Sequence, residues 1–378
     1  MAIILFWVFS GILAYVYVGY PLIVRIWASY AGRPVRRDHL RPTVTVIVSV
    51  YNEEKSIRSK IDNILALEYP PDLLDVIVVS DASVDLTDDI VRMCGCRQVR
   101  LLRLEGRQGK TACQNHAAVH AAGDVLVFTD ATTVVDRRAL IELVENFADA
   151  TVGCVAGSLV YQARPGSLAA SGNTTYWGYE IALRSGESKL GTLVGVSGCL
   201  YAVRRSAYRP ISPELISDFV IAMRIREQGL RTVLEPLARC FEETLDRSHH
   251  ELSMRVRVAI RSIAALVRER RFLNPFVDPF FAWQLWSHKL LRYASPYCWV
   301  VALMACVTLV GDPFYRLALA AHLGLIAEGI AGFLLEGRSQ QVGLLRKPYY
   351  FLLTNVASFI ATVRYVMGER VVTWNPTR

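Results

Sequence analysis

The chain has 378 residues, of which 53% are hydrophobic, and its formal net charge is +8. This apolar content is too high for an ordinary soluble protein of this size, and the excess lies at the two ends. A positive charge could indicate nucleic acid, but no zinc-finger or RNA-binding motif accompanies it, so nucleic acid is not an expected partner. The basic residues cluster beside apolar segments, which makes an anionic lipid bilayer the simpler partner.

Residues 1–24 are predicted to form an N-terminal transmembrane anchor. Residues 1–20 are almost uncharged, and about 20 apolar residues suffice to cross a bilayer. No basic residue precedes the apolar part and no small-residue cleavage site follows it, which favours an anchor over a removable signal peptide. Basic residues then follow closely, and the positive-inside rule places the next segment in the cytoplasm.

Residues 41–270 are predicted to form one α/β domain. The β-branched run TVTVIVSV is followed by a polar turn and a helix with apolar residues at Ile57, Ile61, Ile64 and Leu65. Three more apolar runs, LLDVIVVS, VRLLRL and DVLVFTD, then alternate with helical segments. Strands that alternate with helices predict a largely parallel sheet covered on both faces. Ligands bind such sheets at the carboxyl ends of the strands.

Polar residues follow each of the four predicted strands, at the point where the strand ends. They are Tyr51-Asn52-Glu53, Ser80-Asp81, Gly106-Arg107 and Thr129-Asp130. All four groups are expected at the same edge of the sheet. No GxGxxG motif follows the first strand, so a dinucleotide oxidoreductase is disfavoured.

The stretch LEGRQGKTACQ contains Gly109-Lys110-Thr111, which matches the end of a phosphate-binding P-loop. The full pattern requires a glycine where this chain has Leu104, so the P-loop is excluded. A lysine and free backbone N–H groups at the start of a helix would still suit a diphosphate. The alternative is a solvated basic loop between a strand and a helix.

The C-terminal part returns to apolar composition. Residues 271–295 mix aromatic and basic side chains and are predicted to form a helix at the membrane interface. Residues 296–368 are predicted to form transmembrane helices, with a hairpin at 297–310 and 314–335 around a Gly-Asp-Pro turn. A third crossing at 349–367 is weakened by Asn355 and Arg364.

Several of these segments resemble the motifs of family 2 glycosyltransferases with the GT-A fold. In chain order the matching segments are Tyr51-Asn52-Glu53-Glu54, SDASVDLT from Ser80, Gly109-Lys110 with Asn115, Phe128-Thr129-Asp130, GCLYAVRR from Gly198, ISDF from Ile216 and SHKLLRY from Ser287. The layout of anchor, cytoplasmic domain and terminal helices is similar to the membrane branch, which includes hyaluronan, chitin-oligosaccharide and cellulose synthases. This resemblance implies a multi-pass protein of the cytoplasmic (inner) membrane with a cytoplasmic catalytic domain.

The resemblance also implies roles for individual residues. Asp130 corresponds to the ligand of a Mg²⁺ or Mn²⁺ ion, although Thr132 stands where the family often has a second aspartate. The nucleotide sugar, with a UDP-sugar favoured, would be bound by Tyr51, Asn52, Glu53, Asp81, Arg107, Lys110 and Arg257. For Arg107 a plain surface role is the alternative.

Asp218 corresponds to the general base, with capping of the following helix as the alternative. One base without a covalent nucleophile implies inversion at the anomeric carbon. Arg257 aligns with the arginine of the QxxRW motif of processive synthases, but Met254 and Val258 replace its glutamine and tryptophan. The loss of that tryptophan argues against a long-chain polymerase.

The predicted function is therefore inverting, metal-dependent transfer of a sugar from a nucleotide-diphosphate sugar to a saccharide or lipid-linked acceptor. Exopolysaccharide or cell-surface glycan synthesis is the expected role. A processive polysaccharide synthase and a non-catalytic membrane subunit that binds nucleotide sugars remain alternatives.

Overall fold

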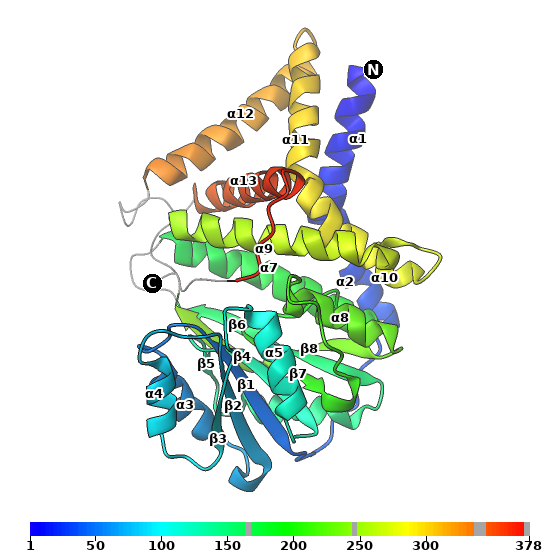
Figure 1. Cartoon of the computed structure of the whole chain (residues 1–378). Coiled ribbons are helices and arrows are strands. Elements are labelled where there is room, and N and C mark those ends of the chain that lie inside the picture. The colour runs from blue at the N-terminus through cyan, green and yellow to red at the C-terminus, as the bar shows by residue number, and fades with distance from the viewer. Residues whose placement is uncertain (163–167, 244–247, 336–344, 374–378) are drawn as a thin grey trace. The chain divides into compact units, whose positions relative to one another are not determined.

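The computed structural model describes residues 1–162, 168–243, 248–335 and 345–373 (Figure 1). The chain divides into two compact units. A sheet unit contains Trp27–Gln162, Glu180–Glu243 and Val371–Arg378, and a helical unit contains Met1–Ile26, Ala163–Tyr179 and Thr244–Arg370. The helix Ser248–Arg268 groups with the helical unit, whereas the predicted boundary at residue 270 includes it in the α/β domain.

The described part of the sheet unit contains a mixed sheet in the order β3-β2-β1-β4-β7-β6-β8-β5. Its strands are β1 (Val44–Val50), β2 (Leu74–Ser80), β3 (Val99–Arg103), β4 (Val125–Asp130), β5 (Val134–Val135), β6 (Val152–Gln162), β7 (Leu200–Arg204) and β8 (Arg231–Glu243). The first four strands pair in parallel, whereas β7 runs antiparallel to β4 and β6. This confirms the predicted α/β GT-A class with a mostly parallel sheet.

Strand β1 forms the centre of the parallel part. All residues of VTVIVSV are buried, as expected for a strand covered on both faces. The register pairs Val50 with Ser80 and Ser49 with Asp130, so β1, β2 and β4 end at the same edge. In β3, Arg103 pairs with Ser80. The four strand ends therefore share one edge, as the sequence predicts.

Helices connect these strands and cover the sheet (Figure 1). They are α3 (Ile57–Leu65), α4 (Thr87–Met93), α5 (Lys110–His120), α6 (Ala139–Glu145) and α8 (Ser217–Glu227). The predicted apolar face of α3 is buried through Ile57, Ile61 and Ile64. Helix α5 begins directly after Gly109, which brings its first residue, Lys110, to the edge where the parallel strands end.

The helical unit contains helices from both ends of the chain. They are α1 (Ala2–Ala14), a π turn (Tyr15–Gly19), the start of α2 (Tyr20–Ala31), part of α7 (Leu168–Leu190), α9 (Ser248–Arg268), α10 (Pro279–Leu285), a second π turn (Trp286–Leu290), α11 (Leu291–Thr308), α12 (Pro313–Leu334) and α13 (Arg346–Val366). Helix α1 packs along α11, and α13 packs on α9 and α12. The two π turns are joined by a 2.7 Å hydrogen bond between the hydroxyl groups of Tyr15 and Ser287.

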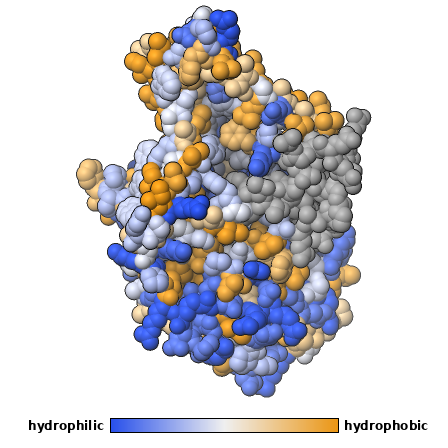
Figure 2. Space-filling view, turned by 180° about the vertical axis from the view of Figure 1, so that it is seen from behind, coloured by the Kyte–Doolittle hydropathy of each residue, from blue (hydrophilic) through white to orange (hydrophobic). Residues whose placement is uncertain are grey.

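Among the described residues, three helices are long and apolar enough to cross a membrane, namely Ala2–Ala31, Pro279–Thr308 and Pro313–Leu334. Figure 2 shows hydrophobic side chains exposed in the upper part of the view, at the level of α1, α11 and α12 in Figure 1. The segment predicted as an interfacial helix, 271–295, contributes residues 279–295 to the continuous helix Pro279–Thr308. No glycine interrupts that helix, and its π turn keeps the backbone helical.

Candidate active site

The turn after β1 is fastened to the loop after β2. Asn52 has a left-handed backbone conformation with φ 52°, which asparagine tolerates better than most residues. Its side-chain oxygen accepts a hydrogen bond from the Val84 N–H at 2.9 Å, and its own N–H donates to the Ser83 hydroxyl at 3.1 Å. The Glu53 N–H donates to the Thr87 hydroxyl at 2.8 Å, at the start of α4. Two of the predicted motifs thus form one surface.

The carboxylate of Asp81 holds the turn at residues 106–109 against the same surface through hydrogen bonds. Its side chain is fully buried, and its carboxylate accepts the N–H of Gln108 at 2.6 Å and the N–H of Gly109 at 3.1 Å. Arg107 lies beside it, with Nε 3.8 Å from Oδ2. The guanidinium of Arg107 stacks over the Tyr51 ring, 3.5 Å from its centroid. Since backbone N–H groups already engage Asp81, it acts here as an anchor of the turn.

Lys110 extends from the start of α5 to the end of β4. Its ammonium group forms an ion pair with Asp130 and donates to the Gly198 carbonyl at 3.3 Å. Burial lowers the pKa of Lys110, but the nearby carboxylates of Asp130 and Asp218 outweigh this effect and raise it above the ordinary value. Lys110 therefore remains a cation at neutral pH.

Asp218 reaches the same point from α8. A Cβ atom on residue 198 would lie 2.8 Å from Oδ2 of Asp218 and 3.2 Å from Nζ of Lys110. The N-cap of α8 is Ile216, so Asp218 does not cap the helix but lies in its first turn. The positive end of the helix dipole favours an ionised carboxylate there. Asp130, Lys110 and Asp218 thus meet around Gly198.

The residues present fit a divalent cation. Asp130 is accessible, with 31% of its side chain exposed, and offers the hard oxygen ligand that Mg²⁺ or Mn²⁺ accepts. Among the described residues no group of three His, Cys, Asp or Glu side chains could hold a metal ion alone. A cation bound by one carboxylate takes its other ligands from substrate phosphates and water.

A buried lysine beneath this site was not predicted. Lys60 on α3 is only 2% exposed and donates hydrogen bonds to the Thr129 hydroxyl at 2.9 Å and the Thr133 carbonyl at 2.7 Å. The signal in the sequence was its spacing, because Lys60 comes three residues after Ile57 and four before Ile64, on the buried face of the helix.

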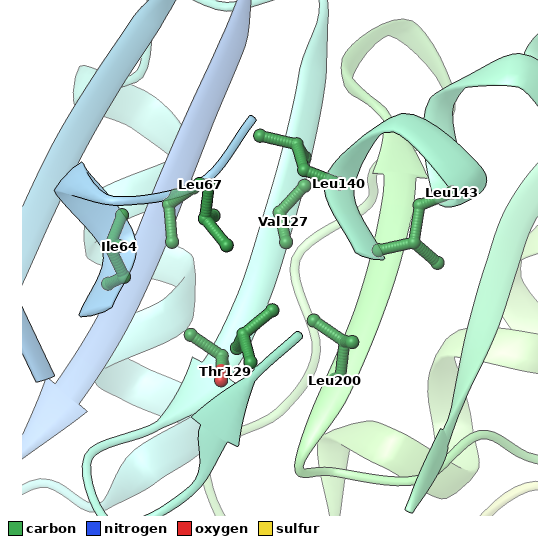
Figure 3. Close-up of a pocket in the computed structure, with 9 residues that line it drawn as sticks. Ile64, Leu67, Val127, Thr129, Leu140, Leu143 and Leu200 are labelled. Atoms are coloured by element: carbon green, nitrogen blue, oxygen red, sulfur yellow. The ribbon is translucent and has the colours of Figure 1, made fainter. Parts of the chain in front are cut away.

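A small cavity lies beside this region, inside the sheet unit (Figure 3). Its lining is apolar except for one hydroxyl and comprises Val46, Ile64, Leu67, Val127, Thr129, Val135, Leu140, Leu143 and Leu200. A sugar or nucleotide site needs several polar groups to orient its ligand. The cavity therefore belongs to the core between the sheet and helices α3 and α6.

Arg257 is the one candidate residue outside the sheet unit. It lies on α9 in the helical unit, whereas the other candidate residues belong to the sheet unit.

Comparison with known proteins finds similarity to glycosyltransferases. Residues 45–211 match the model of "Glycosyl transferase family 2", a range that includes Asp130 and ends before Asp218. A poly-beta-1,6-N-acetyl-D-glucosamine synthase of Staphylococcus aureus (strain COL) is 24% identical over 204 residues, which cover 52% of this chain and 49% of that protein. The probable glycosyltransferase YdaM of Bacillus subtilis (strain 168) is 26% identical over 223 residues, which cover 56% and 53%. The chain thus spans about half the length of these relatives.

A solved structure resembles the whole chain. It is the mannosyltransferase PcManGT from Pyrobaculum calidifontis in complex with GDP-Man and Mn²⁺, with a TM-score of 0.73 and 26% sequence identity. The match covers 97% of this chain and 100% of that one.

Proposed function

We propose that the chain, whose residues 45–211 match family 2 glycosyltransferases, transfers a sugar from a nucleotide-diphosphate sugar to a saccharide or lipid-linked acceptor. The observation that carries the proposal is the meeting of Asp130, Lys110 and Asp218 around Gly198. An ammonium group and two carboxylates thus lie at the edge where ligands bind to α/β sheets, which supports roles in binding a diphosphate, holding a metal ion and accepting a proton.

Lys110 and Asp130 stabilise the leaving diphosphate. The diphosphate gains negative charge as the glycosidic bond breaks, and the ammonium group of Lys110 nearby lowers the energy of that charge. A divalent ion held by Asp130 would supply further positive charge to the same phosphates. When the diphosphate binds, Lys110 can exchange its contact with Asp130 for a phosphate oxygen. We propose Mg²⁺ or Mn²⁺ as the ion, and the Mn²⁺ of the archaeal mannosyltransferase supports this choice.

Asp218 activates the acceptor hydroxyl. A sugar hydroxyl is a poor nucleophile, and a carboxylate within hydrogen-bond distance can accept its proton during attack. The first turn of α8 and the ammonium group of Lys110 both favour the ionised form of Asp218. Direct attack assisted by this single base inverts the configuration at the anomeric carbon, so we propose an inverting reaction.

The donor is bound by the turns that follow β1, β2 and β3. We propose that Tyr51, Asn52 and Glu53 line the nucleotide, with Arg107 stacked on Tyr51. Asp81 then orients the base through the turn that it anchors, because its carboxylate holds the N–H groups of residues 108 and 109. We propose a UDP-sugar as donor. GDP-mannose is the second candidate, which the archaeal mannosyltransferase favours.

The helical unit and the relatives support a proposal for the acceptor and for the cellular location of the protein. Three helices among the described residues could span a membrane, and the poly-beta-1,6-N-acetyl-D-glucosamine synthase relative supports a role in exopolysaccharide synthesis. We propose a protein of the cytoplasmic membrane whose sheet unit and Arg257 face the cytoplasm. Processive synthesis is the alternative. The absence of a tryptophan at Val258 favours single additions.

A transfer assay tests this proposal. The full-length protein in lipid nanodiscs is incubated with radiolabelled UDP- and GDP-sugars and with lipid-linked or oligosaccharide acceptors. We expect transfer from one donor, its loss with EDTA, and inverted anomeric configuration by NMR. Asp218→Asn should lower kcat by about 10²–10⁴-fold. The matched control is Glu227→Gln at the exposed end of the same helix, which should remain active. Nucleotide binding without transfer from any donor would favour the non-catalytic alternative, and an active Asp218→Asn variant would exclude this residue as the base.

A further inference from the structure

Lys60 places a buried positive charge directly behind the candidate metal ligand. Its ammonium group contacts neutral oxygens: the Thr129 hydroxyl at 2.9 Å, the Thr133 carbonyl at 2.7 Å and the Thr133 hydroxyl at 3.4 Å. In the described part of the chain no carboxylate lies within ion-pair distance of it. Burying an ammonium group without a paired carboxylate is costly. Burial accordingly lowers the pKa of Lys60 to about 8, and the charge of Asp130 opposes that shift.

The contacts of Lys60 enclose the turn that carries Asp130. Thr129 precedes Asp130, and Thr133 ends the turn, with its hydroxyl donating to the Asp130 carbonyl at 3.0 Å. The Thr129 hydroxyl in turn donates to the Cys199 carbonyl at 2.9 Å, next to Gly198. Lys60 is thus hydrogen-bonded to both ends of the turn. Through the Thr129 hydroxyl it is also linked to the Cys199 carbonyl, next to Gly198.

Two lysines therefore neutralise Asp130, and they differ in mobility. The side chain of Lys110 is 23% exposed and can turn toward a bound diphosphate. Lys60 is 2% exposed and enclosed by three hydrogen bonds, so its charge stays in place when Lys110 leaves. A free divalent cation that approaches Asp130 meets this fixed positive charge, whereas a cation bound to a diphosphate carries a net negative charge with it.

We propose that Lys60 is a fixed internal counter-ion of Asp130 that keeps the affinity for free metal low, so that the metal enters together with the nucleotide diphosphate. This inference rests on the proposed function, since it takes Asp130 as the metal ligand. Lys60 acts through Asp130 and touches neither metal nor substrate. Its charge repels a free cation and attracts a diphosphate, so it favours a metal ion that arrives with a bound anion over the free ion.

The test measures the dissociation constant of Mn²⁺ by EPR titration of the full-length protein in nanodiscs, with and without uridine diphosphate, and with guanosine diphosphate as a second probe. In Lys60→Met, the affinity for Mn²⁺ without nucleotide should rise about tenfold, because the variant lacks a charge that repels the cation. The affinity for uridine diphosphate without metal, measured by isothermal titration calorimetry, should fall for the same reason. An unchanged or weaker affinity of the nucleotide-free variant would overturn the proposal.

Matched variants distinguish the effect of the Lys60 charge from the effect of a disturbed turn at residues 130–133. Lys55→Met removes an exposed lysine just before the same helix and should leave both constants unchanged. Thr133→Val loosens the turn but keeps the charge, so it should not raise the affinity for Mn²⁺; a rise equal to that of Lys60→Met would overturn the electrostatic role. If Lys60→Met does not fold, Lys60→Gln carries the same expectation. Asp130→Asn should abolish Mn²⁺ binding, and wild-type binding in that variant would refute the proposed metal site itself.

Discussion

Oδ2 of Asp218 lies 2.8 Å from the position that a Cβ atom of residue 198 would occupy, so the glycine at 198 leaves room for that carboxylate. Gly198→Ala should push the Asp218 side chain away from Lys110 and from the acceptor position. A displacement of this size can lower kcat by about 10²-fold without unfolding the protein. The measurement is the steady-state rate of sugar transfer together with the melting temperature.

The control for this variant is Gly324→Ala on α12, where an added Cβ would meet nothing within 4 Å. It should retain full activity. Wild-type kcat in Gly198→Ala would show that the position of Asp218 does not limit the reaction.

Lys110 is expected to serve the donor and not the acceptor. In Lys110→Met, Asp130 loses its ion pair and the diphosphate loses a nearby ammonium group. The KM for the nucleotide sugar should rise and kcat should fall, each by about tenfold or more, because hydrogen bonds to charged groups contribute about 1.5–3 kcal/mol. Lys110→Arg keeps the charge and should recover part of the loss. An effect confined to the KM of the acceptor would contradict this assignment.

The sequence was sufficient to predict the parallel part of the sheet, β1 to β4, and the edge at which these strands end, but not the strands β5 to β8. Apolar β-branched runs that end in polar turns define β1, β2 and β4, and parallel strands place their ends on one edge. The buried position of Lys60 was missed because a lysine was not expected on the apolar face of α3, although its spacing from Ile57 and Ile64 indicated it.

Other features could not be derived because they depend on contacts between distant segments. The anchoring of the glycine turn by Asp81 requires β2 and the residues after β3 to be side by side. The meeting of Lys110 and Asp218 at Gly198 joins three segments separated by many residues. The grouping of α9, with Arg257, in the helical unit reflects its packing on α13, which no local pattern reports.

Gly109 is required for two reasons. Its φ of 91° is unfavourable for a residue with a side chain, and a Cβ there would lie 2.5 Å from the Val372 carbonyl oxygen. Gly109→Ala should therefore displace the Val372 segment and strain the turn that Asp81 anchors. We expect a loss of stability of about 1–3 kcal/mol and a higher KM for the donor.

Deleting residues 371–378 from the Gly109→Ala variant separates the two causes, because it removes the clash and leaves the strain. Melting temperatures should show partial recovery in the shortened variant. Equal losses with and without the C-terminal segment would mean that Val372 does not press on this turn.

The buried Lys60 should also give the stability a distinct pH dependence. Its pKa in the folded protein is about 8, mainly because of burial, whereas a lysine in an unfolded chain has a pKa of about 10.4. Between these values the unfolded chain binds more protons, so the folded state gains stability as the pH rises from about 8 to 10. The melting temperature of the wild type relative to Lys60→Met should increase across that interval. Parallel curves for the two proteins would show that Lys60 does not titrate as described.

Thr132→Asp should strengthen the metal site. Thr132 lies two residues after Asp130 and is partly exposed, so a carboxylate at this position can reach a cation bound by Asp130. A second carboxylate raises the affinity of an oxygen-ligand site for divalent cations. The Mn²⁺ concentration that gives half-maximal transfer should fall by about tenfold, and the affinity for Mn²⁺ without nucleotide should rise in parallel. The matched control is Thr151→Asp, at a surface turn next to Asp149, which should change neither quantity. If Thr132→Asp and the wild type need the same Mn²⁺ concentration for half-maximal transfer, the cation does not bind at Asp130. A carboxylate added two residues from the metal ligand would change that concentration.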